Sequence, residues 1–263
     1  MKHRLDITIF LFLLFLVAHF VGLIIIDHYN VTEELPYNIE PPEVKEGGSF
    51  LPIFIVIIIS TIAALVLIKF RALRLWKLWF FLSVLIALAI AFSTFMDSRI
   101  AFAIAFVLAA WKLFKPNVVI HNFTEVFIYG GLASIFVPIL NLFSIIVLLI
   151  LISVYDFISV YKTKHMVEMA KFQIKSKIFS GLNIPYQNKK ATAILGGGDI
   201  GFTLLFSGVI LIEFGKVEAI ITSVIISLFL FGLFVMGKKN KFYPAMPVLT
   251  AGCLFALLII NLI

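Results

Sequence analysis

Nine long apolar runs decide what this chain can fold into, because each is about as long as a lipid bilayer is thick. A transmembrane helix needs about 20 consecutive apolar residues, within a range of about 17 to 25. The runs span about residues 7–26, 50–68, 76–96, 100–114, 118–138, 140–161, 193–212, 217–236 and 244–262. They are continuous rather than alternating, so the strands of a membrane barrel are not expected. The pattern predicts an all-α polytopic membrane protein with nine transmembrane helices.

The charged residues fit this plan and give it a direction. Only 13% of the residues are charged and 62% are hydrophobic, which lies far outside the range of soluble domains. If the N-terminus is cytoplasmic, 18 of the 21 Lys and Arg residues fall in cytoplasmic connections, and only Lys45, Arg99 and Lys216 fall outside. Basic residues collect on the cytoplasmic side of membrane proteins. We therefore predict a cytoplasmic N-terminus and an external C-terminus, and we expect no nucleic-acid partner despite the net charge of +7.

We expect the runs to form a single membrane domain over residues 1–263. The protein is then a multi-pass integral protein of the cell membrane, and the lipid bilayer is one of its partners. Helices one to six occupy residues 1–161, a basic cytoplasmic loop occupies 162–192, and helices seven to nine occupy 193–263. In the loop, Met166, Met169 and Ile174 recur at near-helical intervals among lysines. This spacing is typical of a basic amphipathic helix on the anionic leaflet, although a solvated positive loop is the alternative.

Two carboxylates stand out because an ionised Asp near hydrocarbon costs about 2.5 to 3.5 kcal/mol on insertion scales. Asp156 lies about five residues from the inner end of the sixth run, which is roughly 8 Å deep at 1.5 Å per residue. Asp199 lies six or seven residues into the seventh run, which enters from the same side, at roughly 10 Å if that run is helical throughout. The two groups are therefore expected at similar depth on neighbouring helices.

Carboxylates a few ångströms apart cannot both ionise easily, so they share one proton. One can then act as general base on a water while the other protonates a peptide carbonyl, which is the chemistry of aspartic proteases. Three glycines, Gly196 to Gly198, precede Asp199 and disfavour a regular helix, so we expect an extended or turned backbone there. Such a backbone is tolerated at membrane depth where it lines a wet cavity, and it lets a substrate segment pair with the main chain.

Four other polar residues in apolar runs could form a second relay: His19, His121, Asn122 and Glu125. No pair has convincing metal-ligand spacing, so we expect neither a metal nor a cofactor. His121 and Glu125 are four residues apart and share a helix face, and the interpretation favoured by the sequence is that they face water. Gly201 and Gly208 fit close helix packing.

Three motifs together resemble the presenilin and signal peptide peptidase family of intramembrane aspartic proteases. They are Tyr155-Asp156 in the sixth helix, Gly196-Gly197-Gly198-Asp199 as a Gly-x-Gly-Asp pattern in the seventh, and Tyr243-Pro244-Ala245-Met246 opening the ninth. The resemblance implies that Asp156 and Asp199 are the catalytic pair, supported by Tyr155, Gly196 and Gly198. It also implies that Pro244, Ala245 and Met246 border the active site, with Met246 in place of the family's usual Leu.

The predicted orientation resembles that of presenilin and is opposite to that of signal peptide peptidase. It implies transmembrane-helix substrates of type I orientation. The loop between the two catalytic helices is much shorter than in presenilin, so the chain looks like a compact microbial, archaeal-type homologue that needs neither self-cleavage nor obligatory subunits.

Two other classes of protein use comparable features. A proton- or cation-coupled transporter also carries intramembrane carboxylates and broken helices, but it predicts a repeat symmetry that this sequence lacks. A catalytically silent protein that captures transmembrane helices would keep the same residues without turnover.

Overall fold

The computed structural model describes residues 4–40, 50–70, 72–163, 166, 169, 172, 173, 178–186, 191–237 and 243–262. Within these ranges the chain forms nine α-helices, two 3-10 turns and one β-hairpin. The helices are α1 (Leu5–Thr32), α2 (Phe50–Lys69), α3 (Leu73–Ser93), α4 (Ser98–Phe114), α5 (Val118–Phe136), α6 (Leu142–Tyr161), α8 (Gly197–Glu213), α9 (Lys216–Met236) and α10 (Met246–Ile260). The 3-10 turns are η1 (Pro36–Asn38) and η2 (Val137–Ile139), and the strands are β1 (Gly181–Tyr186) and β2 (Ala191–Gly196).

Six of the described helices are long and apolar enough to cross a membrane: α1, α2, α3, α5, α6 and α9. The other three are shorter, with 17 residues in α4, 17 in α8 and 15 in α10. These lengths lie at or just below the lower end of the range for a span, about 17 residues. Each of the nine predicted helices has a counterpart in the structure, and eight of them start and end within a few residues of the expected positions.

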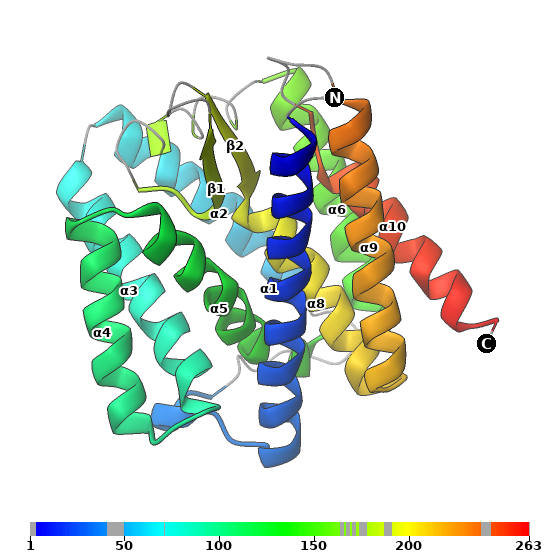
Figure 1. The fold of residues 1–263 in the computed structure, drawn as a ribbon, viewed down its shortest axis with the longest axis horizontal. Coiled ribbons are helices and arrows are strands. Elements are labelled where there is room, and N and C mark those ends of the chain that lie inside the picture. The colour runs from blue at the N-terminus through cyan, green and yellow to red at the C-terminus, as the bar shows by residue number, and fades with distance from the viewer. Residues whose placement is uncertain are drawn as a thin grey trace.

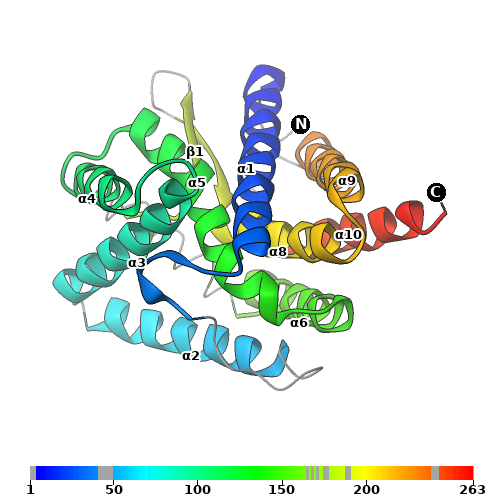
Figure 2. The same cartoon turned by 90° about the horizontal axis from the view of Figure 1, so that it is seen from below.

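Helix α1 runs through the middle of the bundle and packs against α5, α8 and α9 (Figures 1 and 2). On one side of it lie α3 and α4, and on the other lie α6, α9 and α10 (Figure 2). The contact between α1 and α5 is close because two glycines meet there. A Cβ atom added to Gly130 would lie 2.9 Å from the Cα atom of Gly22. Small residues let membrane helices approach in this way.

A second close contact joins α3 and α5 and leads to a test of the packing. A Cβ atom on Gly131 would lie 2.9 Å from the carbonyl carbon of Ala87 and closer still to its oxygen. Because both are backbone atoms, Gly131→Ala must push the helices apart, and we expect it to lower the thermal unfolding temperature in detergent. The control is Gly232→Ala, since nothing lies within 4 Å of the added atom and Ala favours a helix by about 1 kcal/mol. Equal stability of the two variants would contradict this packing.

The β-hairpin was not expected: the sequence predicted a loop up to residue 192 and a helix from 193, whereas residues 181–186 and 191–196 form two strands within an otherwise helical fold. Strands β1 and β2 pair antiparallel from Gly181 opposite Gly196 to Tyr186 opposite Ala191. Leu182 and Leu195, which pair, are buried in the core. Strand β1 lies between the apolar runs and β2 extends into the start of the seventh run, and hydropathy carries no information on strand pairing. Each strand satisfies the backbone groups of the other, so the hairpin can sit at one end of the helical bundle (Figure 1).

Part of the loop before the hairpin lies outside the described residues. Of the proposed amphipathic helix, Met166, Met169, Phe172 and Gln173 are helical, whereas Ile174 is not described. Met169 and Phe172 pack against a small core that contains Trp76, and the rings of Trp76 and Phe172 are 5.9 Å apart. The described part of this helix therefore contacts α3, and its contact with lipid stays a prediction.

Candidate active site

Asp156 lies near the C-terminal end of α6, and the start of α10 approaches it. The backbone N–H of Met246 donates to Asp156 Oδ2 at 3.2 Å, and the backbone of Ala245 also hydrogen-bonds to this carboxylate. N–H groups in the first turn of a helix have no partner within the helix and attract negative charge. The carboxylate of Asp156 thus accepts from backbone N–H groups at the start of α10 that have no partner within the helix.

The three residues of the third motif surround this contact. Pro244 and Met246 are buried, and Ala245 is the N-cap of α10. One turn further along, the hydroxyls of Ser153 on α6 and Thr250 on α10 are 2.7 Å apart. These contacts fix α10 against the face of α6 that carries Asp156. Tyr155, next to Asp156, is half-buried.

Asp199 is in the first turn of α8, directly after the glycine-rich turn. Gly196 is extended, with φ −65° and ψ 146°, as predicted, and it ends β2 and caps α8. Gly197 and Gly198 are already helical, so the prediction of an extended or turned backbone is wrong for these two, and the seventh helix begins at Gly197 rather than 193. A helix can begin at Gly197 because the N–H groups of its first turn, which need partners outside the helix, are supplied with one here. The N–H of Gly197 finds one in the carbonyl of Ser180 at 3.2 Å.

The glycines of the turn differ in what surrounds them. A Cβ atom on Gly197 would lie 2.7 Å from the hydroxyl oxygens of Tyr129 and Ser180, whereas one on Gly196 would lie 3.2 Å from Asp199 Oδ2. At Gly198 the added atom would make only an ordinary contact, 3.6 Å from the ring of Phe202. Gly197 is therefore required for packing, while Gly198 is exposed and leaves room beside Asp199.

The two helices that carry the acids, Asp156 on α6 and Asp199 on α8, contact each other. Helix α8 packs against α6, and α10 packs against both. The backbone carbonyl of Asp199 accepts a hydrogen bond from the Thr203 hydroxyl at 2.7 Å, and that hydroxyl lies 3.1 Å from Nε2 of the fully buried His19 on α1. The structure thus gathers Asp156, Asp199 and the start of α10 on three adjoining elements. Gly208, as predicted, lies in a tight helix contact, with Val137 and Ile26 as neighbours.

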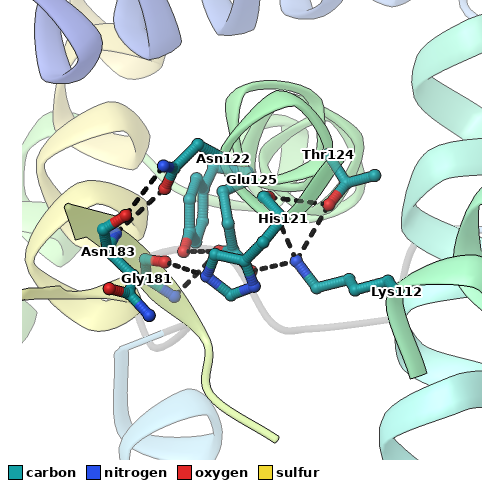
Figure 3. A network of polar contacts seen from close by, with 8 residues as sticks. Lys112, His121, Asn122, Thr124, Glu125, Gly181 and Asn183 are labelled. Atoms are coloured by element: carbon teal, nitrogen blue, oxygen red, sulfur yellow. Dashed lines mark hydrogen bonds and ion pairs between the residues drawn. The ribbon is translucent and has the colours of Figure 1, made fainter. Parts of the chain in front are cut away.

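Glu125 does not face water, so the interpretation that the sequence favoured is wrong for this residue, whereas His121 is half-buried and donates from Nε2 to the carbonyl of Gly181 at 2.7 Å. Glu125 is 1% exposed, and its Oε1 accepts a hydrogen bond from Nζ of the equally buried Lys112 at 2.7 Å. Figure 3 shows this network between α4, α5 and the hairpin, with Asn122 paired to Asn183. The spacing of His121 and Glu125 was visible in the sequence, but Lys112 comes from a different helix and Gly181 from strand β1.

The fold has known counterparts among solved structures. Two crystal structures, each described as a presenilin family intramembrane aspartate protease, in space groups C222 and P2, superpose on this chain with TM-scores of 0.69 and 0.68. The first is 19% identical and the match covers 97% of this chain and 98% of the other; the second is 20% identical and the match covers 96% of each. The arrangement of helices is therefore that of a presenilin-type membrane protein. A comparison with curated protein sequences finds no match.

The sequence model of the family described as "Signal-peptide peptidase, presenilin aspartyl protease" matches residues 9–197, well over half of the chain. The chain belongs to this family. The matched part contains Tyr155 and Asp156 and stops two residues before Asp199. The resemblance inferred from the three motifs is confirmed, and the comparisons give no support to the transporter hypothesis.

Proposed function

We propose that this protein is an intramembrane aspartic endopeptidase of the Gly-x-Gly-Asp type, with Asp156 and Asp199 as its catalytic pair. The observation that supports the proposal is that two half-buried carboxylates lie on α6 and α8, two helices that pack together in a chain of this family. The reaction is the hydrolysis of a peptide bond within a transmembrane segment of a membrane-protein substrate.

The two carboxylates divide the chemistry through one shared proton. The ionised carboxylate removes a proton from a water molecule, whose oxygen attacks the carbonyl carbon of the scissile bond. The protonated carboxyl gives its proton to the carbonyl oxygen, so that a neutral tetrahedral intermediate forms. Collapse of the intermediate breaks the C–N bond: the amine leaves with a proton from the first carboxyl, and the second carboxylate takes a proton back from one of the two hydroxyls, which restores the shared proton. The N–H of Met246, 3.2 Å from Asp156 Oδ2, holds that carboxylate in one orientation during these transfers.

The membrane topology of the proposal has nine spans, a cytoplasmic N-terminus and an external C-terminus, in the cell membrane. The distribution of Lys and Arg supports this orientation. The N-terminal end of α1 and the β-hairpin lie at the same end of the bundle, which fits a hairpin on the cytoplasmic side (Figure 1). In this orientation the enzyme takes type I substrates. Because the loop between its catalytic helices is short, we expect the enzyme to be active without a partner subunit.

The experiment that tests the proposal uses the purified chain in lipid bilayers with one single-span peptide inserted in either orientation. Mass spectrometry of the products locates the cut. We expect cleavage within the span and a preference for the peptide whose C-terminal side is cytoplasmic. Cleavage only outside the span would contradict the intramembrane reaction, and a preference for the opposite orientation would contradict the proposed topology.

The open space at Gly198 yields a test of substrate approach. Gly198→Ala adds a methyl group that meets only the Phe202 ring at 3.6 Å, so we expect an unchanged unfolding temperature. The methyl group would instead stand on the exposed side of the turn beside Asp199, where a substrate backbone must approach, and we expect kcat/KM to fall by about 10-fold or more. Unchanged kcat/KM would show that substrate does not pass over Gly198.

A further inference from the structure

Glu125 holds the first residue of the hairpin through one of its two carboxylate oxygens. Its Oε1 accepts from Lys112 Nζ at 2.7 Å, while its Oε2 accepts from the backbone N–H of Gly181 at 2.9 Å and from the hydroxyl of Tyr129. The two oxygens of the carboxylate thus bind different groups. One side closes an ion pair between α4 and α5, and the other side binds backbone and side chain next to the glycine-rich turn (Figure 3).

Both backbone groups of Gly181 are fixed from α5. Its N–H donates to Glu125, and its carbonyl accepts from Nε2 of His121 at 2.7 Å. Two residues further along β1, Asn122 repeats this arrangement. Its amide donates to the carbonyl of Asn183 at 2.8 Å, and its Oδ1 accepts the N–H of Asn183 at 2.9 Å. Side chains of α5 therefore bind β1 much as a neighbouring strand would.

This attachment reaches Asp199 through two short routes. Across the hairpin, Gly181 is the pairing partner of Gly196, which is the N-cap of the helix that carries Asp199. On the other side, Tyr129 lies against Gly197, where an added Cβ atom would be 2.7 Å from its hydroxyl oxygen. Glu125 contacts both Gly181 and Tyr129, so it fixes the turn before Asp199 from two directions.

We propose that Glu125 is a positioning residue that sets the place of Asp199 by anchoring Gly181 and Tyr129. The inference rests on the proposed role of Asp199 as a catalytic group. An ion pair that merely stabilised the bundle would need only the contact between Glu125 and Lys112. Buried ion pairs are in general weak evidence for stability, because desolvation of the two charges offsets their attraction. The contacts of Oε2 give this carboxylate a use that the ion pair does not explain.

A pair of double variants separates the two roles of the carboxylate. Lys112→Met with Glu125→Gln and Lys112→Met with Glu125→Leu both remove the ion pair and both leave the site without a net charge. Only the Gln variant keeps an oxygen that can accept from Gly181 and Tyr129. We expect the Leu variant to lose about 100-fold in kcat, since a displacement of about 1 Å costs on that order, and the Gln variant to stay much closer to the wild type.

The single variant Glu125→Gln adds a second test. With Lys112 present, the one amide oxygen cannot accept from both the Lys112 ammonium and the Gly181 N–H. Whichever donor the oxygen accepts from, the amide NH2 group faces the other one. We expect this variant to lose kcat with little change in KM, and we expect Lys112→Met added to it to restore kcat. A purely structural ion pair would allow the same rescue, because Lys112→Met removes the unpaired charge, but its loss would lower kcat equally in both double variants.

Amide hydrogen exchange measured without substrate makes the inference independent of turnover. Residues 178–186 and 191–197 should exchange faster in the Lys112→Met, Glu125→Leu variant than in its Gln counterpart. Equal exchange and equal kcat in the two double variants would overturn the positioning role. Asp199→Asn is assayed alongside: cleavage by that variant would refute the proposed function, whereas its inactivity together with equal kcat in the double variants would refute only the role of Glu125.

Discussion

Replacing either Asp156 or Asp199 with Asn is expected to abolish cleavage of a transmembrane substrate. Asn has nearly the same shape as Asp, but it can neither take a proton from water nor give one to a carbonyl oxygen. Loss of a general acid or base costs up to about 10⁴-fold, and here one residue serves in both capacities during the cycle. Single-turnover rates with a labelled single-span peptide, followed by mass spectrometry, measure the loss.

The matched control for these variants is Asp6→Asn. Asp6 is exposed in the first turn of α1 and, among the residues that the structure describes, forms an ion pair with Arg4 alone at 3.0 Å, so the change should leave turnover as it is. Asp156→Asn keeps a side-chain oxygen that can accept from Met246, and its unfolding temperature should stay near that of the wild type. Cleavage that persisted in either of the two active-site variants would refute the pair as the catalytic groups.

The second large effect is expected from Gly181→Ala. Gly181 has φ +130°, which an L-residue with a side chain rarely adopts, at a cost of about 1–3 kcal/mol. The added Cβ atom would also lie 2.9 Å from the backbone nitrogen of Gly197 and closer to the carbonyl oxygen of Leu195. Both neighbours are backbone atoms of the segment that leads to Asp199. The hairpin must therefore open at the end that adjoins α8.

We expect Gly181→Ala to lower kcat by about 100-fold or more while the rest of the helical bundle stays folded. Amide hydrogen exchange in residues 191–197 reports the local opening, and the far-ultraviolet circular dichroism reports the helices. Thr192→Ala is the control, because Thr192 is an exposed residue of β2 at the far end of the hairpin, opposite Pro185. Full activity of Gly181→Ala would mean that the hairpin does not position Asp199.

The helices could be predicted from the sequence because each apolar run is long and continuous, and this property does not depend on the neighbours. The hairpin could not, since the pairing of residues 181–186 with 191–196 depends on contacts between a segment of the loop and the start of the seventh apolar run. The same limit applies to the turn at Gly197 and Gly198. Three glycines in a row disfavour a helix by propensity, but the N–H of Gly197 has an external partner in Ser180, and the helix starts there.

The candidate site divides in the same way. Asp156 and Asp199 could be found because a carboxylate in an apolar run is costly wherever it lies. Their surroundings could not be found so directly. The bond between Asp156 and Met246 spans 90 residues, and the buried group at Glu125 joins side chains of α4 and α5 to a strand about 56 residues further on. The single-helix spacing of His121 and Glu125 indicated a shared face but not what that face contacts.

The bond from Met246 to Asp156 also bears on how the protein is made. Translation delivers α6 first, and 90 residues must follow before the N–H group that holds Asp156 exists. Chains are synthesised at about 5–20 residues per second, so this interval lasts several seconds. During that time the carboxylate of Asp156 lacks its partner on α10, and the three elements of the site cannot yet meet. A protease that acts inside membranes is therefore completed only with its last helix, after the rest of its own transmembrane segments have left the ribosome.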